Sequence, residues 1–100
     1  MAINAPIAYA FDQHTISDTA LGLVDLDFTQ AQVDDASRAV ISVRSGSINI
    51  RYDGTAPTIA IGHTWFTGDT FAIVGRYNTD ALQIIRNGAS DAVIDVTLEK

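Results

Sequence analysis

The sequence predicts a small all-β protein, an antiparallel β-sandwich or jelly-roll-like barrel preceded by a less regular N-terminal arm. After residue 38, hydrophobic residues alternate with polar ones along several segments, which is the pattern of half-buried strands. Short turns rich in Gly, Asn and Asp separate these segments at intervals of about 8–12 residues, as in sandwiches and barrels. Valine and isoleucine, which suit a pleated surface, fill many of the alternating positions.

Length and composition indicate one domain covering residues 1–100. The chain has 100 residues, of which 47% are hydrophobic, and this is too many for a disordered segment. It contains no cysteine, which excludes disulfides and thiolate metal sites and leaves the compartment open. The net charge of −6, with the basic residues scattered singly, argues against nucleic acids and anionic membranes as partners.

The sequence has no feature that directs it into or across a membrane. No apolar run approaches the length of about 18 residues that spans a bilayer. The first 14 residues lack a basic region ahead of their apolar stretch, so no signal peptide is expected. We therefore expect a soluble protein that is made in the cytoplasm.

The N-terminal third is less regular than the remainder. Ile7, Tyr9 and Phe11 alternate with two alanines, which predicts a strand or an extended arm, and we assign residues 1–18 to this arm. Alternation of apolar residues with aspartates over residues 21–28 predicts a further strand.

A short helix is expected after that strand. Thr29 and Gln32 have the spacing of a capping box, which begins helices. The helix is predicted to end at about Ala36, and so short a helix needs packing for its stability.

The remaining chain predicts three hairpins, each with a glycine in its turn. They pair residues 39–43 with 47–52 around Gly46, 64–66 with 70–74 around Gly68, and 81–86 with 91–98 around Asn87-Gly88. Between the first two hairpins, Asp53-Gly54 makes a turn, a loop contains Pro57, and Ile59 and Ile61 form a short strand. The polar residues 75–80 read as a loop.

Candidate chemistry is sparse. His63 lies six residues before Asp69, which suggests a cupin-like metal site, but the only other histidine is His14. We therefore expect His63 to have a structural role rather than a metal. The sequence has no nucleophile elbow, no phosphate-binding loop and no Asp-rich calcium loop. No enzyme, cofactor or metal is expected.

The aromatic residues allow one alternative function. Trp65, Tyr52, Tyr77 and Tyr9 would form a sugar-binding platform if they lay together on one exposed face. Burial of Trp65 in the core or between subunits favours a structural role instead.

Two segments carry a resemblance to a known group of proteins. Residues 50–63 read I-R-Y-D-G-T-A-P-T-x-x-x-G-H, and residues 82–97 read L-Q-I-I-R-N-G-A-S-D-A-V-I-D-V-T, with Gly68-Asp69 between them. This pattern is similar to small virion structural proteins of tailed bacteriophages and prophages. The likeness covers about residues 38–99.

The resemblance implies a capsid decoration or cement protein in the virion, assembled in the host cytoplasm. It implies the major capsid protein and further copies of the chain, as a trimer or another small oligomer, as partners. A head–tail connector or tail component is the alternative within this class, and a carbohydrate-binding module on the virion is the alternative outside it.

The resemblance carries no catalytic residues, so its matching positions are expected to shape the backbone. These positions are Asp53, Gly54, Thr55, Pro57, Gly62 and His63. Their glycines permit unusual φ angles, their proline stiffens the loop, and their Asp and Thr side chains bond the turn. Ile7, Tyr9 and Phe11 form the expected arm that adds a strand to a capsid edge.

Overall fold

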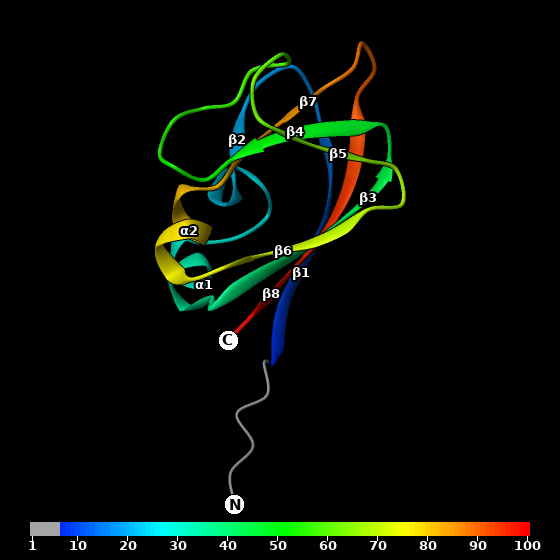
Figure 1. Cartoon of the computed structure of the whole chain (residues 1–100). Coiled ribbons are helices and arrows are strands. Elements are labelled where there is room, and N and C mark those ends of the chain that lie inside the picture. Colours follow the sequence, from blue (N-terminus) through cyan, green and yellow to red (C-terminus); the bar gives the residue numbers. More distant parts are fainter. Residues whose placement is uncertain (1–6) are drawn as a thin grey trace, which may run out of the picture.

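The computed structural model describes residues 7–100, which form two antiparallel sheets of four strands each (Figure 1). The first sheet has the order β1-β8-β3-β6, and the second has the order β2-β7-β4-β5. The strands are β1 (Ala8–Ile16), β2 (Leu21–Gly22), β3 (Arg38–Ser45), β4 (Ser47–Arg51), β5 (His63–Phe66), β6 (Thr70–Val74), β7 (Gln83–Arg86) and β8 (Ala92–Glu99). The predicted all-β, sandwich-like class is confirmed.

The strand pairing is nested. The first strand pairs with the eighth, the second with the seventh, the third with the sixth and the fourth with the fifth. The pairs β3–β8 and β4–β7 join these units into the two sheets. Strands that are far apart in the sequence are therefore neighbours, and the two ends of the described chain lie at the same end of the molecule (Figure 1).

The three predicted hairpins are wrong, although their strands exist. In each one, the turn carries the chain from one sheet to the other, so that β3 and β4, β5 and β6, and β7 and β8 lie in different sheets. At the first corner a single residue, Gly46, separates β3 from β4 and has φ 75°, which favours glycine. A Cβ there would lie 3.0 Å from the Cα of Ala92, so a side chain would also crowd the backbone of β8.

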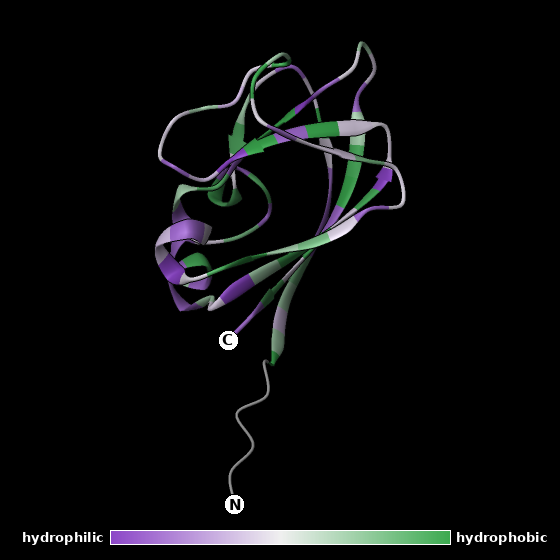
Figure 2. Cartoon of the chain, in the orientation of Figure 1, coloured by the Kyte–Doolittle hydropathy of each residue, from purple (hydrophilic) through white to green (hydrophobic). Residues whose placement is uncertain are grey.

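The core fills the space between the two sheets. Alternate residues of β3, β4 and β8 point inward, and Ile41, Ile48 and Ile94 are fully buried. Hydrophobic and hydrophilic residues alternate along the strands, whereas the two α-helices are largely hydrophilic (Figure 2).

The predicted helix is confirmed as α1 (Gln30–Asp35), with Thr29 and Gln32 forming the reciprocal capping box. Its Val33 is buried in the core. The predicted strand over residues 21–28 is mostly wrong, because β2 covers only Leu21–Gly22 and the 3₁₀-helix η1 (Leu23–Asp25) follows.

Two other local predictions are also wrong. The predicted loop over 75–80 is largely α2 (Arg76–Ala81), which packs beside α1. Its polar residues hide the helix in the sequence, and the buried Thr79 bonds to the Arg76 carbonyl oxygen at 2.8 Å. No strand forms at Ile59 and Ile61, which lie in an irregular loop.

The expected N-terminal arm is, from residue 8 onward, an edge strand of the first sheet. β1 pairs along its length with β8, and Ile7 exchanges two backbone hydrogen bonds with Lys100, at 2.9 and 3.0 Å. These residues are therefore already bound by their own chain. The part of the predicted arm at residues 1–6 lies outside the described residues.

Replacing Ile94 by alanine is expected to lower the free energy of unfolding by about 2–5 kcal/mol, because a fully buried side chain would leave a cavity. The matched change Val93→Ala, on the outer face of the same strand, is expected to cost at most about 1 kcal/mol. Urea denaturation followed by the fluorescence of Trp65 measures both. Equal losses would contradict the assignment of the two faces.

Candidate functional site

Most of the positions that match in the sequence resemblance lie in one loop, residues 52–62, between β4 and β5. The loop folds back over the outer face of the second sheet, where it covers the middle of β4. The expectation that its residues shape the backbone can be examined residue by residue.

Asn49 holds this loop from below. The alternation of β4 places Asn49 on the outer face, yet its side chain is only 1% exposed because the loop covers it. Its Nδ2 donates to the carbonyl oxygen of Thr58 at 2.9 Å, and its Oδ1 accepts from Thr64 Oγ1 at 2.6 Å and from Asn87 Nδ2 at 3.0 Å. One buried amide thus joins the loop, β5 and the end of β7.

Gly62 lets the loop approach the sheet closely. Gly62 has φ 146°, and a Cβ at this position would lie 2.9 Å from the carbonyl oxygen of Ile50. Pro57, which belongs to the loop, is buried. The positive φ predicted for Gly62 is confirmed, and the structure adds a steric reason that the sequence did not reveal.

The start of the loop is an ion-paired turn. Arg51 Nε donates to Asp53 Oδ1 at 3.1 Å, and the same carboxylate accepts from the Thr55 backbone N–H at 3.3 Å. The hydrogen bond from Arg51 lowers the pKa of Asp53 and raises the pKa of Arg51 itself. Gly54 takes φ 86° at the tip of this turn, so the predicted turn chemistry of Asp53 and Gly54 is present.

The far end of the loop is a second tight turn that presents two isoleucines. The backbones of Thr58 and Ile61 exchange hydrogen bonds at 2.9 and 3.2 Å. Ile59 and Ile61 are 54% and 57% exposed. The loop thus exposes two large aliphatic side chains to solvent, while its Thr58 carbonyl oxygen accepts a hydrogen bond from the buried side chain of Asn49.

Where the loop begins and ends, Tyr52 and His63 form a small aromatic surface. Their ring centroids are 6.0 Å apart and the rings are nearly parallel, at 26°. With Arg51 and Asp53 they line a shallow hollow of about 230 Å³. His63 begins β5 and is exposed, so it is part of the same surface as the loop.

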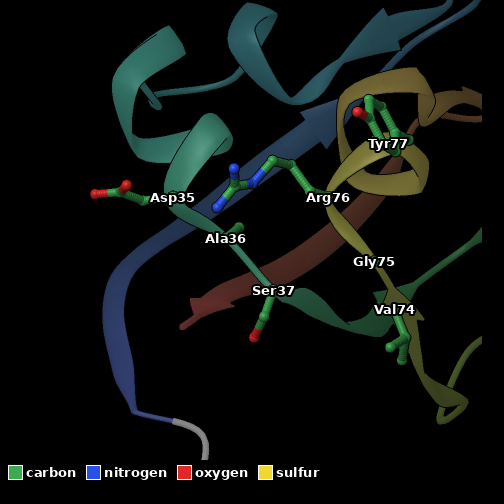
Figure 3. A pocket seen from close by; sticks show the side chains of 7 residues that line it. All are labelled: Asp35, Ala36, Ser37, Val74, Gly75, Arg76 and Tyr77. Atoms are coloured by element: carbon green, nitrogen blue, oxygen red, sulfur yellow. The ribbon is translucent and has the colours of Figure 1, made fainter.

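A second hollow lies between the two helices and the adjoining ends of β3 and β6 (Figure 3). Its volume is about 540 Å³, and Arg76 and Tyr77 from α2 line one side of it. Asp35 and Ser37 line the other side. It holds no arrangement of groups that indicates a reaction.

The three residues of the expected arm differ in exposure. Phe11 and Ile7 are 62% and 65% exposed, whereas Tyr9 is partly buried against the core. The Tyr9 hydroxyl donates to the carbonyl oxygen of Gln32, and burial raises its pKa. Contact of these residues with a capsid stays a prediction.

The two histidines lie in different sheets. His14 is on β1 with its Nδ1 3.0 Å from Asp12 Oδ2, and His63 is on β5 beside Tyr52. Within residues 7–100 no three His, Asp or Glu side chains gather in a metal-binding arrangement.

The aromatic residues do not form one platform. Trp65 is half-buried and stacks on Phe71, with centroids 4.2 Å apart and an interplanar angle of 14°. Tyr9 contacts α1, Tyr52 begins the loop, and Tyr77 is on α2. Trp65 therefore takes part in the packing of β5 on β6 rather than in a shared aromatic surface.

Comparison with known proteins adds no relative. No family model, no curated protein and no solved structure matches the chain. In the described part of the chain, no helix combines the length and the apolar character needed to cross a lipid bilayer.

Sequence reasoning missed Asn49. Its position between two isoleucines of an alternating strand predicts a solvent-facing side chain. The local pattern cannot reveal that a later segment folds back over that face. The only signal is indirect, because the proline and the glycine that follow permit a close return of the chain.

Replacing Asn49 by alanine is expected to lower the free energy of unfolding by about 2–4 kcal/mol, since it leaves buried partners without hydrogen bonds. Amide hydrogen exchange in residues 53–62 should also accelerate. The matched control Asn78→Ala removes an exposed bond to Val74 and should cost less than about 1 kcal/mol. Unchanged loop exchange in Asn49→Ala would contradict the anchoring role.

Two glycines of the loop allow a matched comparison. Gly54→Ala should cost about 1–2 kcal/mol for its positive φ alone, because no atom lies within 4 Å of the added Cβ. Gly62→Ala should cost at least about 1 kcal/mol more, because its Cβ also collides with the β4 backbone. Thermal and urea unfolding of the two variants measure the difference, and equal costs would show that the loop does not press on β4.

Proposed function

We propose that this chain is a non-enzymatic structural protein of a tailed-phage virion, which decorates and cements the capsid shell through protein–protein contacts of the 52–62 loop. The observation that carries the proposal is the exposure of Ile59 and Ile61 on a loop held by Asn49. Burying such side chains on a partner is favourable. Because the loop is already ordered, little conformational entropy opposes binding.

The sequence resemblance supports the same segment. Its most specific part, from Asp53 to His63, covers most of this loop and the first residue of β5, and Gly62 is the residue that lets the loop lie against the sheet. The nested strand pairing further supports the jelly-roll form of the fold, which viral capsid domains share with lectins and cupins. Since fold alone does not define function, the loop carries the argument.

The charge distribution supports a protein partner rather than a nucleic acid. Of the six basic side chains, all within the described residues, five pair with carboxylates: Arg38, Arg44, Arg51, Arg86 and Lys100. No basic surface is thus available to neutralise phosphates, on which nucleic-acid affinity depends. The proposed partners are the major capsid protein and further copies of this chain.

The copy number of the chain in purified particles tests the proposal. Quantitative mass spectrometry against the major capsid protein should give about one copy per capsid subunit for a decoration protein. A dozen copies or fewer would instead support the head–tail connector or tail component. Absence from the particle would contradict the virion role.

The loop is tested by replacing Ile59 and Ile61 together with serine. The proposed contact buries both isoleucine side chains against the capsid, so their loss should reduce the number of particle-bound copies at least about tenfold. The free energy of unfolding should stay within about 0.5 kcal/mol, because both side chains are exposed. The control Val24→Ser changes an exposed aliphatic residue on η1 and should leave incorporation intact. Equal incorporation of both variants would exclude the loop as the contact.

A further inference from the structure

The two sheets differ in how their outer faces are covered. On the second sheet, the outward residues Asn49 and Ile85 are buried, and the 52–62 loop lies over Asn49. On the first sheet, none of the outward residues of β1, β8, β3 and β6 is buried. A four-stranded face is therefore open on the side of the molecule opposite the loop.

An uncharged row crosses the middle of this open face. The strand register places Phe11 of β1 opposite Thr97 of β8, Thr97 opposite Val40 of β3, and Val40 opposite Ala72 of β6. Directly opposed residues share a face of the sheet, so the row spans all four strands. Phe11 is 62% exposed at one end of it.

Polar side chains flank the row on one side and an ion pair flanks it on the other. The next row toward the Gly46 corner contains Gln13, Asp95, Ser42 and Thr70, which bond to one another in pairs. In the next row in the other direction, the Arg38–Glu99 ion pair lies between Ala8 and Val74, and Val74 is 62% exposed. The face therefore carries exposed apolar side chains among paired polar groups, as protein interfaces do.

The open face is electrically neutral, although the chain carries −6. Its outward charged residues are two arginines and two acids, and they pair internally as Arg38–Glu99 and Arg44–Asp95. Two copies can therefore approach through this face without the repulsion that opposes contact elsewhere between like-charged molecules. A different acidic or basic partner would find no unpaired charge on this face to match.

We propose that a second copy of this chain packs on the outer face of the first sheet, sheet against sheet, with the row through Phe11, Thr97, Val40 and Ala72 at the centre of a twofold dimer. The pairing is isologous, so each row meets the same row of the partner. The sequence resemblance implies a trimer, whereas an isologous contact between identical faces gives a pair. The inference does not depend on the loop or on a capsid.

The size of the face sets the expected affinity. Four strands about 4.8 Å apart and roughly six residues long at about 3.3 Å per residue give a footprint of about 19 by 20 Å. Such a footprint is about 380 Å² on each copy and about 760 Å² in total, which is below the size of a stable specific interface. We therefore expect a concentration-dependent dimer rather than a permanent one.

Sedimentation velocity of the full chain from micromolar to millimolar concentration tests the proposal. The expected result is a reversible monomer–dimer equilibrium that Val40→Glu weakens about 100-fold or more, because the twofold buries two unpaired carboxylates. The control Val24→Glu, on η1 away from the face, should leave the equilibrium unchanged. A monomer at every concentration, a trimer, or a dimer insensitive to Val40→Glu overturns the proposal.

A second measurement decides the question if Val40→Glu does not fold. The chain has no cysteine, so Thr97→Cys can carry a single spin label at the centre of the face. Sheets that pack face to face lie about 10 Å apart, so labels on the two copies should lie within roughly 25 Å in the dimer. Ala60→Cys, on the loop of the opposite side, should give a longer distance. A short distance for Ala60 and not for Thr97 overturns the proposal.

Discussion

The buried side-chain amide of Asn49 is the constraint on which the candidate site depends. A polar group without access to water must find its partners within the protein, and Asn49 finds them in Thr58, Thr64 and Asn87. These three residues come from the loop, β5 and the end of β7. The amide therefore helps to fix the position of the loop, on which Ile59 and Ile61 are exposed.

The two outer faces give the molecule two surfaces of different character. The loop side presents a few aliphatic and aromatic residues on an ordered segment, which is a shape for contacting another protein. The opposite side presents an open sheet face whose charges are paired, with an uncharged central row. Because the surfaces lie on different sheets, a copy bound at one does not occupy the other. This arrangement suits a protein that joins copies of itself while it holds a larger partner.

The arrangement of the strands shows how far a local pattern reaches. Alternation located most strands from β3 to β8, and the capping box located α1, because both signals lie within a few residues. Each glycine turn was expected to make a hairpin, yet Gly46, Gly68 and Gly88 lie in turns that carry the chain between sheets. In the described chain, β4 and β5 are the only two strands consecutive in the sequence that pair with each other. Alternation identifies which side of a strand is apolar. It does not decide which sheet the strand joins, because either sheet would bury that side.

The sequence by itself determined the all-β class, the inward faces of most strands, the turn at Asp53-Gly54 and the permissive φ expected at Gly62. These properties follow from side-chain periodicity and backbone sterics, which act over a few residues. Only the tertiary structure decided which strands pair, that β1 belongs to the first sheet, that α2 is helical, and that Asn49 is buried. Each of these depends on contacts between segments distant in the chain, and the free energy of such contacts is absent from any local stretch of sequence.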